Sequence, residues 1–243
     1  VPLFFVLYYA FRDDVTGQLT FGNFKTFFTT PVNLKVAGRS LMIAALSTIL
    51  CLLIAYPVAY IIAKSKIKNK SAILLVFIVP MWVNFVLRIN ALKELLSWMG
   101  LINKSAGWDI FNTVLGMVYD FLPFMILPVY NAVMELNEDV IEAARDLGAP
   151  LSAVLTKIMI PLTMPGIISG ITMVFVPSLT TFAIPDILGG GKIMLIGNII
   201  EQEFSTSMNW NLGSGLSIAL MIFVLISMMF TVKNDGGKES SVW

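Results

Sequence analysis

The chain has 243 residues, of which 57% are hydrophobic and only 13% are charged. Soluble domains carry about 25% charged residues, so this composition excludes an ordinary soluble fold and indicates a membrane protein with several spans. The 16 basic and 15 acidic residues give a net charge of +1, which argues against nucleic-acid binding. The lack of histidine and the single cysteine, Cys51, exclude His-ligated zinc, His-based catalytic triads and disulfides within the chain.

Five stretches of the sequence are apolar and long enough to cross a membrane, which takes roughly 20 residues in a helix. They cover residues 41–63, 72–92, 113–134, 162–182 and 212–232. Residues 1–11 are apolar over about half that length, so we expect them to be the second half of a first helix and not a signal peptide. We expect the helix at 162–182 to start near Pro165 and to bend or end near Pro177. The sequence therefore predicts one all-α transmembrane domain of six helices, the first of them partial.

The charges between these helices predict their orientation, because Lys and Arg accumulate in short cytoplasmic loops. Residues 64–70 contain four lysines, so we expect this loop in the cytoplasm. Alternation then places residues 135–161 and the tail from residue 233 in the cytoplasm. The segments 12–39, 93–112 and 183–211 are expected on the outer side.

The cytoplasmic segment 135–161 is far more polar than its surroundings and is predicted to form a helix, a tight turn and a second helix. Glu142, Ala143 and Ala144 favour a helix. Gly148 can end that helix in a left-handed conformation, and Pro150 can begin the next one. Small side chains in this segment let another protein approach the backbone closely. An ordinary cytoplasmic hairpin explains the same residues equally well.

The same segment resembles the cytoplasmic signature of the permease subunits of ATP-binding-cassette importers. That signature reads EAA, three residues, G, nine residues, I, one residue, L and P. The matching positions of this chain, at the same spacing, are Glu142, Ala143, Ala144, Gly148, Ile158 and Pro161, with Ile160 in place of the leucine. The resemblance implies a bundle of the type I importer (MetI-like) kind, whose segment 135–161 is a coupling helix that docks in a cleft of the ATPase subunit.

A finer resemblance covers nearly the whole chain, for example FLPFMILPVY at 121–130 and the residues 184–204. These stretches are similar to permeases of the importers of the polyamines spermidine and putrescine. The resemblance implies a multi-pass protein of the bacterial plasma (inner) membrane that supplies half of a translocation pathway. Its partners would be a second homologous permease, an ATPase dimer and an extracytoplasmic polyamine-binding protein.

The chain itself is not expected to bind ATP, magnesium or another cofactor. The GGGK stretch at 189–192 lacks the first glycine of the P-loop spacing, and Ile193 stands where Ser or Thr would hold magnesium. ATP and magnesium would be used by the ATPase subunit. The alternatives are an importer of thiamine, iron or phosphonate, a secondary transporter and an intramembrane enzyme. The last two are disfavoured because the sequence has neither internal repeats nor clustered catalytic residues.

A path for polyamines needs carboxylates for the protonated amines and aromatic faces for the cations and their methylene stems. Asp120, beside Tyr119 and roughly 10 Å below the outer end of its helix, is one candidate. Pairing with Arg88 of the neighbouring helix would give it a structural role instead. Asp186, beyond the outer end of the 162–182 helix, is a second candidate, with a turn role as the alternative. Trp82 is either a path aromatic or an interfacial anchor.

Overall fold

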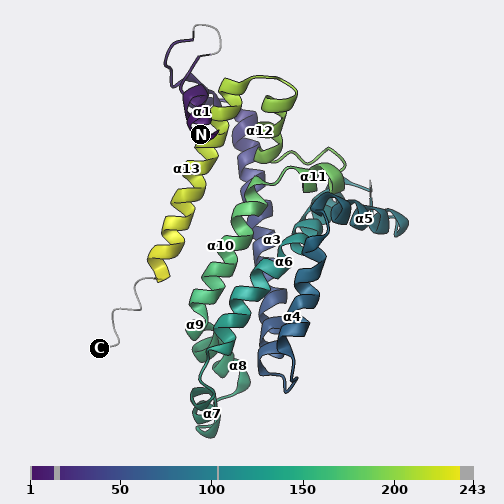
Figure 1. Cartoon of the computed structure of the whole chain (residues 1–243), viewed down its shortest axis with the longest axis vertical. Coiled ribbons are helices and arrows are strands. Elements are labelled where there is room, and N and C mark those ends of the chain that lie inside the picture. Colours follow the sequence, from purple (N-terminus) through teal and green to yellow (C-terminus); the bar gives the residue numbers. More distant parts are fainter. Residues whose placement is uncertain (1, 14–16, 103, 236–243) are drawn as a thin grey trace.

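The computed structural model describes residues 2–13, 17–102 and 104–235. These residues form helices joined by short connections, and their only β-type contact is an isolated bridge between Arg12 and Leu19. The all-α fold class predicted from the sequence is therefore confirmed (Figure 1). The helices are α1 Pro2–Ala10, α2 Gly22–Thr29, α3 Pro31–Lys64, α4 Lys70–Ile78, η1 Val79–Trp82, α5 Phe85–Trp98, α6 Ala106–Met134, α7 Glu138–Asp146, α8 Leu151–Val154, the π-helix η2 Leu155–Met159, α9 Ile160–Leu162, α10 Met164–Thr180, α11 Ala183–Leu188, α12 Ile196–Ser205 and α13 Trp210–Asp235.

Three described helices, α3, α6 and α13, are long and apolar enough to cross a membrane, and the number rises to five if each of two bent pairs counts as one span. The first pair, residues 70–82 and 85–98, bends by 95°, and the second, residues 151–162 and 164–180, bends by 71°. By itself α1, with nine residues, is about half a span.

The stretch 72–92 is predicted from its hydropathy to form one helix, but the structure breaks it. After η1 the backbone becomes extended at Val83, and Asn84 starts α5 by accepting a hydrogen bond from the Val86 amide at 2.9 Å. Pro80, which has no amide hydrogen, lies just before this break. A side-chain cap thus begins a new helix in a new direction, which hydropathy alone does not reveal.

The helix predicted at 162–182 ends near Pro177, which was one of the two expected alternatives, but it does not bend there. α10 begins at Met164, with Pro165 in its first turn as predicted, and continues through Pro177 to Thr180. The 71° bend lies instead near Thr163, between α9 and α10. Proline at the start of α10 costs no hydrogen bond, because the first amides of a helix have no partner within it.

α3, α6 and α10 form the central layer and run side by side along the long axis (Figure 1). Their shared core contains fully buried side chains from all three helices, among them Cys51, Met117, Met125, Val129 and Val174. α13 packs on α1 near one end of the bundle and diverges from α10 toward its own C-terminal end (Figure 1).

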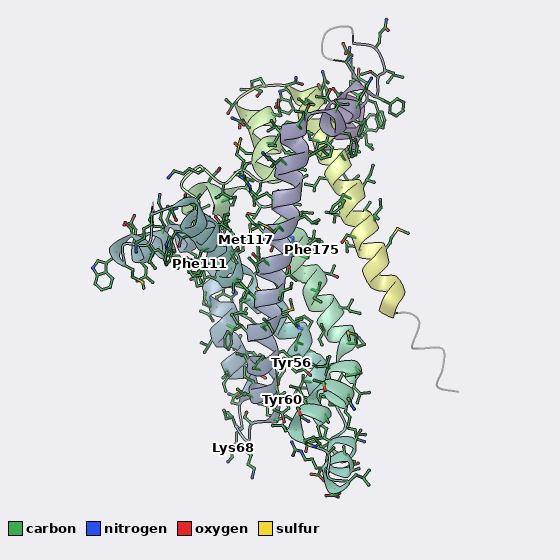
Figure 2. The ribbon with its side chains drawn as sticks, turned by 180° about the vertical axis from the view of Figure 1, so that it is seen from behind. Tyr56, Tyr60, Lys68, Phe111, Met117 and Phe175 are labelled. Atoms are coloured by element: carbon green, nitrogen blue, oxygen red, sulfur yellow. The ribbon has the colours of Figure 1, made fainter. Side chains whose placement is uncertain are left out.

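The segments predicted on opposite sides of the membrane lie at opposite ends of this bundle. α7, α8 and the loop that carries Lys68 are at one end, and α2, α12 and the start of α13 are at the other (Figures 1 and 2). This arrangement agrees with the predicted alternation of sides for these segments, and which end faces the cytoplasm stays a prediction from the lysines of residues 64–70.

α6 and α10 approach each other closely because α10 presents two glycines, four residues apart, to α6. A Cβ atom on Gly166 would lie 2.6 Å from the Pro128 carbonyl oxygen, and one on Gly170 would lie 2.6 Å from the Met125 sulfur. Small residues at this spacing are a known way for membrane helices to bring their backbones together. The central layer therefore depends on the absence of side chains at these two positions.

We predict that Gly166→Leu removes most of the assembled protein from the membrane, because the contacting Pro128 oxygen is backbone and cannot rotate away. The measurement is the amount of protein in membranes and the midpoint of its thermal unfolding in detergent. Gly38→Leu in α3 is the matched control, since a Cβ there would meet nothing within 4 Å. Equal levels and equal midpoints for the two variants would contradict the packing described.

Candidate functional site

α7 and the turn after it form the tip of one end of the molecule (Figure 1). The turn is closed by two backbone hydrogen bonds, from Gly148 to the Arg145 carbonyl at 2.8 Å and from Ala149 to the Ala144 carbonyl at 3.0 Å. Gly148 has a φ of +79°, a conformation that glycine adopts without strain. The predicted helix and tight turn are thus present, and the glycine is needed for them.

The residues of this tip are turned away from the bundle. Glu142 and Ala143 are exposed, and a Cβ atom on Gly148 would meet nothing within 4 Å. Leu147 and Leu151 are 89% and 68% exposed, although both are apolar and lie in a polar segment. Exposed apolar side chains close together outside the membrane-spanning helices offer a surface on which another protein can dock.

Leu147 and Leu151 were missed in the sequence analysis. The available signal was their position, since they flank the glycine of the signature inside a segment rich in charges. We name the surface made by Glu142, Ala143, Leu147, Gly148 and Leu151 the coupling tip.

The second half of the signature packs differently from the first. Ala144 is half-buried, and so are Ile158 in the π-helix η2 and Pro161 in α9. Their neighbours Val154 and Met159 are fully buried in the main core. The signature therefore joins residues 142–148, of which Ala144 alone is half-buried and the others are exposed, to a root at residues 158–161 that is packed into the bundle.

An ion pair ties the start of α7 to the end of α3. Lys64 Nζ lies 3.0 Å from Glu138 Oε1, and the hydrogen bond and charge of Lys64 lower the pKa of Glu138 below its ordinary value. Because the Glu138 side chain is 70% exposed, this pair positions α7 more than it stabilises the fold.

Asp120 of α6 forms an ion pair with Arg88. The sequence offered this pair as the alternative to a role of Asp120 in the pathway. Arg88 Nη2 of α5 lies 2.5 Å from Asp120 Oδ1, and the two side chains are only 9% and 8% exposed. The neighbouring Tyr119 is 44% exposed and takes no part in this pair. In this conformation the carboxylate of Asp120 holds a cation of the chain itself.

Asp186 lies on α11 near the outer end of the bundle and is exposed. Its Oδ1 accepts a hydrogen bond from Asn198 Nδ2 at 2.7 Å, and the same Nδ2 donates to the Phe182 carbonyl at 3.0 Å. Desolvation by the surrounding chain, followed by the negative charge of Glu201, raises the pKa of Asp186. The side chain is thus oriented by α12 and lies near a second carboxylate.

The pathway candidates do not line either of two cavities among the described residues. A cavity of about 640 Å³ between α10, α12 and α13 is lined by Phe182, Glu201 and Phe204 among others. A second, of about 530 Å³, lies beside the start of α7 and is lined by Asn131 and Glu135 among others. None of the four predicted pathway side chains lines either cavity: Trp82, at the end of η1, is 80% exposed, and the other three are Tyr119, Asp120 and Asp186.

The sequence of the chain matches known membrane components of transport systems. A family model described as "Binding-protein-dependent transport system inner membrane component" matches residues 55–233. The chain is 38% identical over 231 residues to the spermidine/putrescine transport system permease protein PotB of Haemophilus influenzae, covering 90% of this chain and 78% of that relative.

Two solved structures share the fold. One is a bacterial ABC transporter involved in the import of the acidic polysaccharide alginate, with a TM-score of 0.71, 17% identity and coverage of 99% of this chain and 90% of that one. The other is a bacterial alginate ABC transporter in complex with an alginate pentasaccharide-bound periplasmic protein, with a TM-score of 0.66, 16% identity and coverage of 88% and 81%.

Proposed function

Because the chain belongs to the family of binding-protein-dependent transport system inner membrane components, we propose that it is the permease subunit of an ATP-binding-cassette importer for spermidine and putrescine. It is a multi-pass protein of the inner membrane, as its family and its apolar helices require. In the proposed role it forms half of the pathway, and a second, homologous permease forms the other half.

The observation that carries this proposal is the coupling tip. It presents small and apolar side chains at the end of the bundle where the lysine-rich loop also lies (Figure 2). An ATPase subunit can bind to such a surface. ATP and magnesium are used by a dimer of such subunits, and this chain performs no catalysis itself. Movement of the ATPase pulls or pushes the tip, and the embedded root at residues 158–161 passes this movement to α10.

An extracytoplasmic binding protein delivers the solute to the opposite end of the bundle. The alginate transporter that shares this fold was solved with a periplasmic protein bound, which supports a partner of the same kind here. α11 and α12 lie at this end and carry the carboxylates of Asp186 and Glu201 (Figure 1). Adjacent carboxylates suit a protonated amine.

The PotB relatives support polyamines as the solute, and the carboxylates of Asp186 and Glu201 at the outer end suit a cationic solute. An importer of phosphonate, which is an anion, would not depend on the charge of Asp186. This difference provides the test.

We predict that Asp186→Asn lowers spermidine uptake at least tenfold. Asparagine keeps the shape of the side chain but loses the charge, and a hydrogen bond to a charged group contributes about 1.5–3 kcal/mol, where about 1.4 kcal/mol is a factor of ten. Uptake of radiolabelled spermidine is measured in cells that lack other polyamine importers and express the complete set of subunits. Glu94→Gln is the control, because Glu94 is an exposed carboxylate of α5 on the expected outer side. Unchanged uptake by Asp186→Asn, with assembly intact, would favour a solute that is not a cation.

A further inference from the structure

Two buried oxygen atoms near the outer end of α6 have no hydrogen-bond donor among the described residues. Asp109 is 1% exposed and its Oδ2 accepts no hydrogen bond. Asn112 is fully buried, and while its Nδ2 donates to the Leu101 carbonyl at 2.9 Å, its Oδ1 accepts none. Residues three apart on a helix lie on the same face. Since buried acceptors in proteins are nearly always satisfied, these two form a site that lacks its donor.

The cation of Lys192 lies close to this site but makes no hydrogen bond to it. Lys192 Nζ lies 3.8 Å from Asp109 Oδ2, which is beyond the 2.7–3.2 Å of a hydrogen bond. The Lys192 side chain is 61% exposed, whereas the carboxylate it faces is buried. The chain before it turns through Gly190 and Gly191, whose φ values are +60° and +71°. Lys192 therefore supplies charge to the carboxylate but no hydrogen bond.

The packing of α11 on α6 brings this loop to Asp109. A Cβ atom on Gly116 of α6 would collide with Leu188 Cδ1 and would lie 3.1 Å from Ile184 Cγ2, so α11 sits directly against the α6 backbone. Lys192 follows four residues after Leu188, and Asp186 lies on the same short helix. The buried acceptors are thus reached from the part of the molecule that carries Asp186.

We propose that Asp109 and Asn112 form a binding site for a primary ammonium group, which Lys192 occupies loosely in this conformation and which a protonated amine of the solute takes over during transport. This inference rests on the proposed function, because it needs a solute with primary amines. An ammonium group has three donors and no acceptor, so it matches two oxygens that both lack a donor. A free ammonium can approach a carboxylate to about 2.7–2.9 Å, closer than Lys192 comes.

The chemistry of the site favours ammonium over a metal ion. Within the described part of the chain no group of three or more His, Cys, Asp or Glu side chains is placed to hold a metal. One carboxylate and one amide oxygen make a poor cage for Ca²⁺ or Mg²⁺, which take six or more oxygen ligands. Lys192 neutralises the carboxylate while no solute is bound, and it competes with the solute for the same oxygens.

The test is equilibrium binding of tritiated spermidine to the complete importer in lipid nanodiscs, without the external binding protein. We expect Lys192→Gln to bind spermidine at least fivefold more tightly than the wild type, because the internal competitor is gone. Asp109→Asn should bind at least tenfold more weakly. Lys104→Gln should equal the wild type, since Lys104 stacks on Trp108 at 5.1 Å and serves as the matched outer lysine.

Equal affinity of the wild type and Lys192→Gln overturns the inference, and so does the lack of spermidine binding by all the complexes. If Asp109→Asn fails to assemble, Lys192→Gln alone decides, because its side chain is exposed and its removal leaves the packing intact. The proposed function is tested separately by spermidine uptake in cells. If the wild-type importer takes up spermidine in cells, but both variants bind spermidine with the affinity of the wild type, the ammonium site is refuted. The proposed function is then still supported.

Discussion

Gly148→Arg is expected to abolish polyamine uptake and solute-stimulated ATP hydrolysis while the protein stays in the membrane. The position is open, because a Cβ atom placed there would have no heavy atom within 4 Å, so the change does not disturb the core. Arginine adds bulk and charge to the centre of the coupling tip, where the surface is small and apolar. It also places a side chain at a φ of +79°, which costs roughly 1–2 kcal/mol.

The controls separate these two effects. Gly148→Asn tests the backbone alone, because asparagine tolerates the left-handed conformation better than other residues, and it should keep most of the uptake. Glu142→Lys reverses a charge of the tip and should reduce uptake less severely than Gly148→Arg. The measurements are uptake in cells, ATP hydrolysis of the reconstituted complex and co-purification of the ATPase subunit. Normal uptake by the Gly148→Arg importer would exclude the coupling role of this segment.

Asp120→Asn is expected to remove most of the protein from the membrane. The substitution leaves Arg88 charged and buried, and breaking a buried ion pair by removing one partner costs about 3–5 kcal/mol. Arg88 Nε already lacks a hydrogen bond among the described residues, so no second contact compensates. The readouts are the amount of protein in membranes and its thermal unfolding midpoint.

The combination Arg88→Gln with Asp120→Asn should restore expression, because two neutral amides can pair without a buried charge. Asp139→Asn is the control for removal of a carboxylate, since Asp139 is exposed on α7. A single Asp120→Asn variant with wild-type levels and midpoint would mean that the pair contributes nothing to assembly. Asp120 would then return as a candidate for the pathway.

The structure of segment 135–161 could be predicted because it depends on residues that are close together in the sequence. The spacing of Glu142, Gly148 and Pro150 predicts a helix, a left-handed turn and a new start, and the structure forms them through hydrogen bonds between neighbours in sequence. The break after η1 was missed because apolar content continues across it. The start of the new helix there is set by one capping side chain, Asn84. A hydropathy average over many residues does not detect a single capping residue.

Contacts between distant parts of the chain were harder to foresee. The sequence offered Arg88 of the neighbouring helix as a partner of Asp120, but whether the two residues pair depends on how α5 turns after the 95° bend. Asp109 was not singled out, and Lys192 was considered only as the last residue of the GGGK stretch. They lie 83 residues apart, and only the packing of α11 on Gly116 brings them together.

The length of α3 gives the molecule a mechanical link between its two ends. At one end Lys64 binds Glu138 of α7, and at the other the Ser40 hydroxyl accepts a hydrogen bond from the Ile196 amide at the start of α12, at 2.8 Å. These two anchor points are separated by about 36 Å of continuous helix, at 1.5 Å per residue. α3 is one continuous helix between these points, although Pro57 within it removes one backbone hydrogen bond. In the proposed function, a movement of α7 imposed by an ATPase subunit would reach the outer end of the molecule through this one helix.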